Sequence, residues 1–85
     1  MPKKELTWEQ LSKVAHFYGW KVKDIGTKKR YIFQDIHIID VIKVGSIYKL
    51  IFHDYGKVSK ALVMNNDITT KVMILETIQL LTYKI

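Results

Sequence analysis

The first run of apolar residues predicts an amphipathic helix over residues 8–18. Apolar side chains recur every three or four residues, the spacing of one helix face. They are Leu11, Val14, Ala15 and Tyr18. Thr7 precedes the stripe and Gln10 follows three residues later, which is the pattern of a capping box. Gly19 stands where a left-handed residue commonly ends a helix.

The middle of the chain alternates apolar and polar residues between turn signals, which predicts an antiparallel sheet. The predicted strands cover residues 20–25, 31–44, 47–53 and 58–64, and the predicted turns cover 26–30, 45–46 and 54–57. Segment 31–44 is long for a strand, because strands usually have about 5–6 residues. We therefore expect a bend or bulge near Ile38 and Ile39. Because tight turns join antiparallel neighbours, these segments should form one antiparallel sheet, which we expect to have three to four strands.

The last part of the chain predicts a second helix over residues 68–85, capped by Asp67. Its apolar stripe consists of Ile74, Leu75, Ile78, Leu81 and Ile85. The alternative is a further strand over 68–75, where Ile, Thr and Val are strand-prone, giving a small SH3- or Sm-like barrel with an N-terminal helix. The favoured prediction is an α+β fold in the order α-β-β-β-β-α, with residues 1–85 as a single domain.

Two predicted strands have apolar residues on both faces. In 47–53, Ile47 and Ile51 share one face, and Tyr48, Leu50 and Phe52 share the other. In a sheet with one hydrated face, apolar and polar residues alternate more regularly along each strand. Either the helices cover opposite faces, or a second copy or a protein partner covers one of them. We therefore expect a homo-oligomer or a protein interface.

The charge balance favours an acidic partner. Fourteen Lys and Arg against eight Asp and Glu give a net charge of +6 and a pI near 9.6. The chain has no cysteine, which excludes disulfides and thiolate sites. It has no secretory signal and no apolar run long enough for a membrane span, so we expect a cytoplasmic protein without a membrane partner. The wealth of Ile and Lys is typical of an AT-rich genome and indicates a low-GC bacterium, a phage or a mobile element.

The densest charge lies in the segment 26–33, GTKKRYIF. Lys28, Lys29 and Arg30 follow a glycine turn, so we expect a cationic hairpin tip in solvent that contacts phosphates. The supporting residues are Lys21, Lys23 and Lys13, with Tyr31 beside the tip to stack on bases. This predicts a small basic nucleic-acid-binding module with salt-dependent binding. The alternative is an inhibitor or adaptor of phage or mobile-element type that acts by protein–protein binding.

The polar residues favour neither catalysis nor a metal. The histidines, His16, His37 and His53, lack the spacing of zinc ligands. The carboxylates Asp35 and Asp40 have opposite parity on an unbroken strand and would face apart. The serines have no evident base partner, and no phosphate-binding glycine loop occurs. We therefore expect a non-enzymatic protein with no cofactor and no metal.

The run from Leu11 to Phe33, LSKVAHFYGWKVKDIGTKKRYIF, resembles the start of small toxin domains of the HicA type. The shared features are Gly19-Trp20 at the helix end and Gly26-Thr27 at the following turn. The resemblance implies a fold similar to double-stranded RNA-binding domains and contact with RNA. The family's reactive histidine follows that turn, where this chain has Lys28 and Lys29, so the resemblance implies RNA contact without ribonuclease activity.

Overall fold

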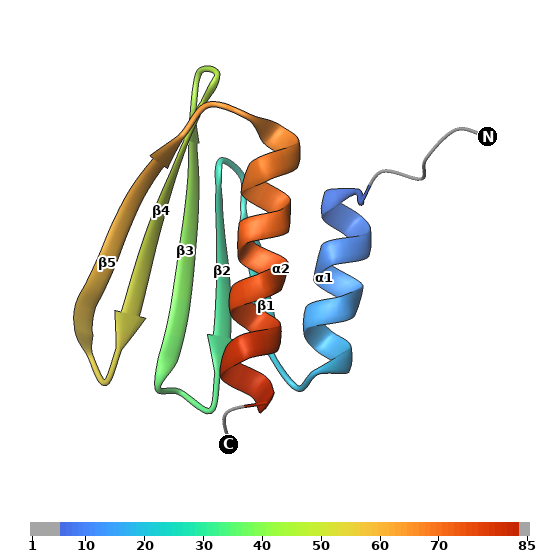
Figure 1. Ribbon diagram of the computed structural model, residues 1–85, viewed down its shortest axis with the longest axis vertical. Helices are drawn as coiled ribbons and strands as arrows, with labels where there is room; N and C mark the ends of the chain where they lie inside the picture. Colours follow the sequence, from blue (N-terminus) through green and yellow to red (C-terminus); the bar gives the residue numbers. More distant parts are fainter. Residues whose placement is uncertain (1–5, 84–85) are drawn as a thin grey trace.

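The computed structural model describes residues 6–83, which form two layers: an antiparallel sheet and a pair of helices on one of its faces (Figure 1). The elements in order are α1 (Trp8–Phe17), β1 (Lys21–Ile25), β2 (Lys28–Phe33), β3 (His37–Val44), β4 (Ile47–Asp54), β5 (Lys57–Met64) and α2 (Asp67–Tyr83). The strands pair in chain order, so β1 and β5 are the edges of the sheet. The predicted α+β fold is confirmed, with five strands instead of three to four.

The N-terminal capping box is present as the sequence predicts. Thr7 Oγ1 accepts a hydrogen bond from the backbone N–H of Gln10 at 3.1 Å, and Gln10 Oε1 accepts one from the backbone N–H of Thr7 at 3.0 Å. These bonds satisfy two of the backbone donors that a helix start leaves unpaired. Past the helix end, Gly19 has a φ of 90°, which a residue with a side chain rarely adopts.

The predicted strand 31–44 is two strands. The chain reverses at Gln34 and Asp35, with φ of 54° and 58°, and the bend predicted near Ile38 and Ile39 is wrong. The predicted turn at 26–30 is also too long, because only Gly26 and Thr27 separate β1 from β2. Lys28, Lys29 and Arg30 therefore lie within β2.

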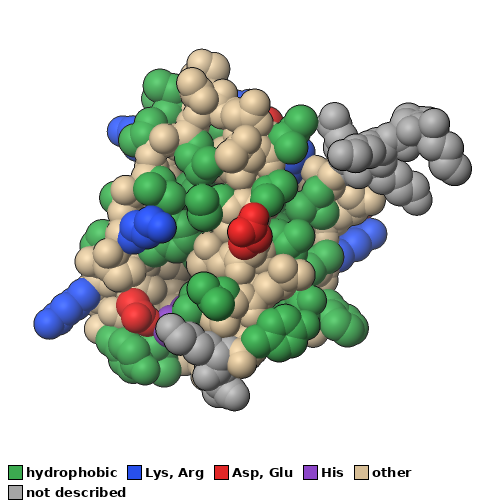
Figure 2. Space-filling view, viewed as in Figure 1, with side chains coloured by type: hydrophobic (Ala, Val, Ile, Leu, Met, Phe, Trp, Pro, Cys, Tyr) green, Lys and Arg blue, Asp and Glu red, His purple; other side chains and the backbone are tan. Residues whose placement is uncertain are grey.

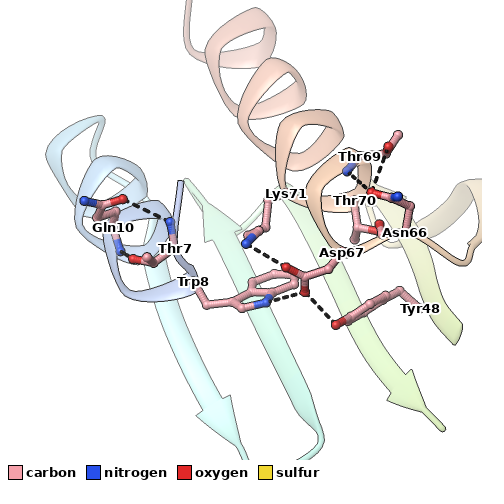
Figure 3. Close-up of polar contacts among 9 residues, drawn as sticks. All are labelled: Thr7, Trp8, Gln10, Tyr48, Asn66, Asp67, Thr69, Thr70 and Lys71. Carbon is pink, nitrogen blue, oxygen red and sulfur yellow. Dashed lines mark hydrogen bonds and ion pairs between the residues drawn. The ribbon is translucent and has the colours of Figure 1, made fainter. Parts of the chain in front are cut away.

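The C-terminal segment is a helix, so the barrel alternative does not hold. Its cap is Asn66 and not Asp67: Asn66 Oδ1 accepts from the backbone N–H of Thr69 at 2.9 Å (Figure 3). Asp67 lies in the first turn, where a carboxylate is favoured by the helix dipole. Predicted helix residues 84 and 85 lie outside the described residues. No helix within residues 6–83 is long and apolar enough to cross a membrane.

The core lies between the sheet and the helices. Trp20 stacks on Phe33 with ring centroids 5.0 Å apart, and Trp20 Nε1 donates to Thr82 of α2 at 2.9 Å. Buried residues of both layers complete it: Leu11, Ala15, Tyr31, Ile39, Val41, Tyr48, Leu50, Phe52, Ile74 and Ile78. Because strand side chains alternate, their sequence neighbours point to the opposite face of the sheet. Both helices lie on the same face (Figure 1), which leaves that opposite face without a covering element from residues 6–83.

Candidate functional site

The sheet face opposite the helices, called the open face below, is mainly aliphatic. Every second residue of each strand points to this face, and the strand register aligns these residues across the sheet. Its aliphatic residues are Ile25, Ile32, Ile38, Ile42, Val44, Ile47, Ile51, Val58, Ala61 and Val63. Val63 is 70% exposed, Ile25 62% and Val44 54%. This area has no Phe, Tyr or Trp within the described strands, because their aromatic residues point toward the helices.

A charged cluster lies in the centre of the open face. Arg30 on β2 and Asp40 on β3 are direct cross-strand partners. The guanidinium donates two hydrogen bonds to the carboxylate, from Nε to Oδ1 at 2.7 Å and from Nη2 to Oδ2 at 3.0 Å. His53 Nε2 on β4 lies 3.1 Å from Asp40 Oδ2. Asp40 is only 3% exposed, whereas the Arg30 side chain is 36% exposed. Arg30 therefore presents part of its cationic surface outward, above a fixed carboxylate.

The ion pair sets the protonation of Asp40. Burial alone would raise the pKa of this carboxyl, but the hydrogen bonds and charge of Arg30, with help from Lys28 and His53, lower it overall. The same contact raises the pKa of Arg30. Near neutral pH the cluster thus holds an ionised carboxylate beneath a guanidinium.

Lysines surround this cluster on the open face. Lys21 and Lys23 point outward from β1, Lys28 from β2 and Lys49 from β4. With Arg30 they place five cations on a face whose strands carry one carboxylate, Asp40. On the helix side, by contrast, the Lys and Arg side chains in view are scattered singly (Figure 2). The strands also place lysines on the helix side, but together with two carboxylates, Asp24 and Asp54, so the excess of positive charge is larger on the open face.

The predicted nucleic-acid-binding residues do not form one site. Lys29 points to the helix side, where its Nζ lies 3.3 Å from Asp24 Oδ2. Lys13 lies on α1, 3.5 Å from Glu9. Tyr31 is fully buried beneath the helices, so it cannot stack on a base as predicted. The alternation of β2 explains this division, since it sends adjacent residues to opposite faces.

The histidines are also divided between the two faces. His37 Nδ1 lies 2.6 Å from Asp54 Oδ1 on the helix side, whereas His53 contacts Asp40 on the open face. Asp35 lies in the turn between β2 and β3 and joins neither pair. Within residues 6–83 no group of three or more His, Asp or Glu side chains has the arrangement of a metal site.

A second polar network joins the two helices to the sheet (Figure 3). Asp67 Oδ1 accepts hydrogen bonds from Trp8 Nε1 at 2.9 Å and Tyr48 Oη at 2.6 Å, and Asp67 Oδ2 lies 2.7 Å from Lys71 Nζ. The bonds from Lys71, Tyr48 and Trp8 lower the pKa of Asp67 to about 2. The network therefore fixes the Trp8 and Tyr48 rings at the end of the sheet near the start of both helices.

Comparison of the chain with family models, with curated proteins and with solved structures finds no match. The resemblance of residues 11–33 to a toxin family therefore gains no support from these comparisons.

The Arg30–Asp40–His53 cluster was missed by reasoning from the sequence. The turn at Gln34 and Asp35 folds β3 back beside β2 and makes Asp40 the direct neighbour of Arg30, whereas on an unbroken strand the two residues would share a face but lie roughly 34 Å apart. Asp35 is a common turn residue, but Gln34 is not and no glycine or proline stands beside it, so the signal for this turn was weak. The aliphatic open face, by contrast, had a signal: apolar residues on both faces of the strand at 47–53.

Proposed function

We propose that this chain is a protein-docking module, of the inhibitor or adaptor class, that binds an acidic protein through its open face. The observation that carries this proposal is the aliphatic face of a five-stranded sheet that no element of residues 6–83 covers. Contiguous exposed apolar surface of this kind is typical of interaction sites.

The size of the open face suits a protein partner. Strands of 5, 6, 8, 8 and 8 residues, about 4.8 Å apart and rising about 3.4 Å per residue, span roughly 600 Å² before the height of the side chains is counted. A standard protein–protein interface buries about 800 Å² on each partner. Binding of single-stranded nucleic acid usually relies on aromatic side chains that stack on bases. The strands place none of these on the open face, so aliphatic contact favours a protein surface.

The charge of the open face indicates which protein surface fits. Two copies packed face to face would bring Lys and Arg of each copy against those of the other, which is unfavourable. An acidic partner would instead pair with the lysines of this face, Lys21, Lys23, Lys28 and Lys49. Arg30 is already oriented by Asp40, so its exposed edge can bind a carboxylate of the partner with little further loss of side-chain conformational entropy.

The charge contribution is tested by affinity capture from nuclease-treated lysate of the natural host, followed by binding measurements with the captured protein. We expect an acidic protein whose affinity falls about tenfold in the Lys21→Ala/Lys23→Ala variant at low ionic strength, with a smaller difference at high salt. The matched control is Lys13→Ala/Lys60→Ala, which removes the same charge from the helix side. Equal weakening by both variants would show that net charge, and not the open face, determines binding.

Nucleic-acid binding is the second candidate, because the cations of the open face outnumber its single carboxylate. On this alternative, filter binding of a short duplex RNA or DNA would weaken steeply with salt, and Lys21→Ala/Lys23→Ala/Lys28→Ala would reduce the slope of log K against log salt by about three. We expect no such binding at physiological salt. Tight binding with the predicted change of slope would replace the protein-docking proposal.

A further inference from the structure

A cleft lies on the helix side of the sheet, at the end where the β1–β2 and β3–β4 turns meet the start of α1. Its volume is about 420 Å³, within the range of small-molecule sites. Trp8, Tyr48, Lys29 and Lys43 line it, together with the two turns at Gly26 and Gly45. The cleft faces away from the open face, so whatever it binds is separate from the docking proposed above.

Two aromatic rings form the apolar part of the cleft. The rings of Trp8 and Tyr48 have centroids 5.7 Å apart and planes inclined by 32°. Both are held from behind by Asp67, which accepts from Trp8 Nε1 and Tyr48 Oη (Figure 3). Since their polar atoms are already engaged by Asp67, the rings offer the cleft a pre-ordered hydrocarbon surface, most of it from Trp8 because Tyr48 is only 7% exposed.

Two ammonium groups lie over the faces of these rings. Lys29 Nζ lies 5.6 Å from the centroid of the Trp8 ring, and Lys43 Nζ lies 5.7 Å from that of Tyr48. Lys43 is exposed, and the Lys29 side chain is 25% exposed. The nearest carboxylate behind the rings, Asp67, is paired with Lys71. An anion in the cleft therefore meets Lys43 and Lys29, of which Lys29 already lies 3.3 Å from Asp24 Oδ2, while the negative charge of Asp67 is compensated.

We propose that this cleft binds a small planar anion with the chemistry of a mononucleotide: an aromatic ring with a phosphate on a short arm. The ligand's ring packs against Trp8 and Tyr48, and its phosphate pairs with Lys43 and Lys29. A bare phosphate would leave the aromatic wall in contact with water, and a neutral ring would give neither ammonium group a new anionic partner. Only a ligand with both an aromatic ring and a phosphate uses the rings and the cations of the cleft together.

The proposal is tested by two-dimensional NMR titration of the full chain with the common nucleoside monophosphates, with adenosine and with inorganic phosphate. We expect at least one monophosphate to bind saturably in the range of about 0.1–1 mM, with shifts concentrated at residues 26–29 and 43–48. Adenosine and inorganic phosphate should each bind at least about tenfold more weakly, because each lacks one half of the recognised chemistry.

Two charge variants give the required control. Lys43→Ala is expected to weaken binding of the monophosphate about tenfold and Lys29→Ala by several-fold, with the fold of each checked by its spectrum. Lys60→Ala is the matched control, because Lys60 Nζ stands 5.9 Å above the Phe52 ring in the same kind of contact away from the cleft. The proposal is overturned if no monophosphate binds saturably, if the shifts lie elsewhere, or if Lys43→Ala binds as well as the unaltered chain. Adenosine or phosphate binding as tightly as the monophosphate would also overturn it.

Discussion

Replacing Asp40 with alanine is expected to lower the free energy of unfolding by about 2 kcal/mol at pH 7. Removing one partner of a buried ion pair typically costs about 3–5 kcal/mol, because the remaining charge is left unpaired. The lower figure applies here because the Arg30 side chain is 36% exposed and water can solvate it once Asp40 is gone. Chemical denaturation of the alanine variant and the unaltered chain measures the difference.

The pH dependence of this effect has a defined sign. The folded pKa of Asp40 is lowered, so its stabilisation is present above the unfolded pKa of about 3.9 and is lost as pH falls through the folded pKa. The groups that face this carboxyl are Arg30, Lys28 and His53. The difference between Asp40→Ala and the unaltered chain should therefore shrink as the pH falls below the unfolded pKa of about 3.9. Because Asp67 has a lowered pKa too, both proteins should lose stability in this range.

A double variant separates the ion pair from simple packing. Arg30→Met/Asp40→Leu replaces both charges with apolar groups of similar size, and such replacements are often neutral or stabilising. We expect it to be more stable than Asp40→Ala alone. An alanine variant as stable as the unaltered chain, at pH 7, would mean that the Arg30–Asp40 contact contributes nothing.

Replacing Ile42 with aspartate is expected to weaken binding of the captured protein partner by at least about 100-fold. Ile42 lies on β3 in the middle of the open face, and burying an isoleucine contributes about 1.5–3 kcal/mol. The new carboxylate would also face an acidic surface, which adds repulsion. Calorimetry or surface plasmon resonance with the purified partner measures the loss.

This substitution should leave the fold intact. Lys28 and Lys49 are the cross-strand neighbours of Ile42, so an aspartate there gains opposite charges on both sides. Leu80→Asp is the matched control, because Leu80 is 63% exposed on α2, on the other side of the molecule. If Leu80→Asp weakens binding as much as Ile42→Asp does, the partner docks on the helix layer.

The sequence predicted the parts of the fold that depend on local signals. Three features each depend on a few neighbouring residues: the capping box at Thr7 and Gln10, the apolar stripe of α2 and the turn at Gly45. The turn at Gln34 and Asp35 was missed, because only Asp35 is of a type enriched in the left-handed conformation and no glycine marks the turn. The pairing of Arg30 with Asp40 depends on that turn, so it was missed as well.

The placement of the basic segment depends on strand boundaries, which sequence patterns fix poorly. Starting β2 at Lys28 and not at Tyr31 changes a cationic tip into alternating residues on two faces. Lys28 and Arg30 consequently belong to the open face, whereas Lys29 belongs to the cleft on the helix side. The expectation of an interface was made from Ile47 and Ile51, whose face is the one left without a covering element.

Photo-cross-linking in a nuclease-treated lysate of the source organism tests the docking face most directly. A cross-linking amino acid replaces Val63 on the open face in one variant and Leu80 on the helix side in the other, two positions of similar exposure at 70% and 63%. We expect the Val63 position to give a single main adduct with an acidic protein, and the Leu80 position to give none. Adducts from Leu80 alone, or adducts of Val63 only with nucleic acid or with a second copy of this chain, would contradict binding of an acidic protein to the open face.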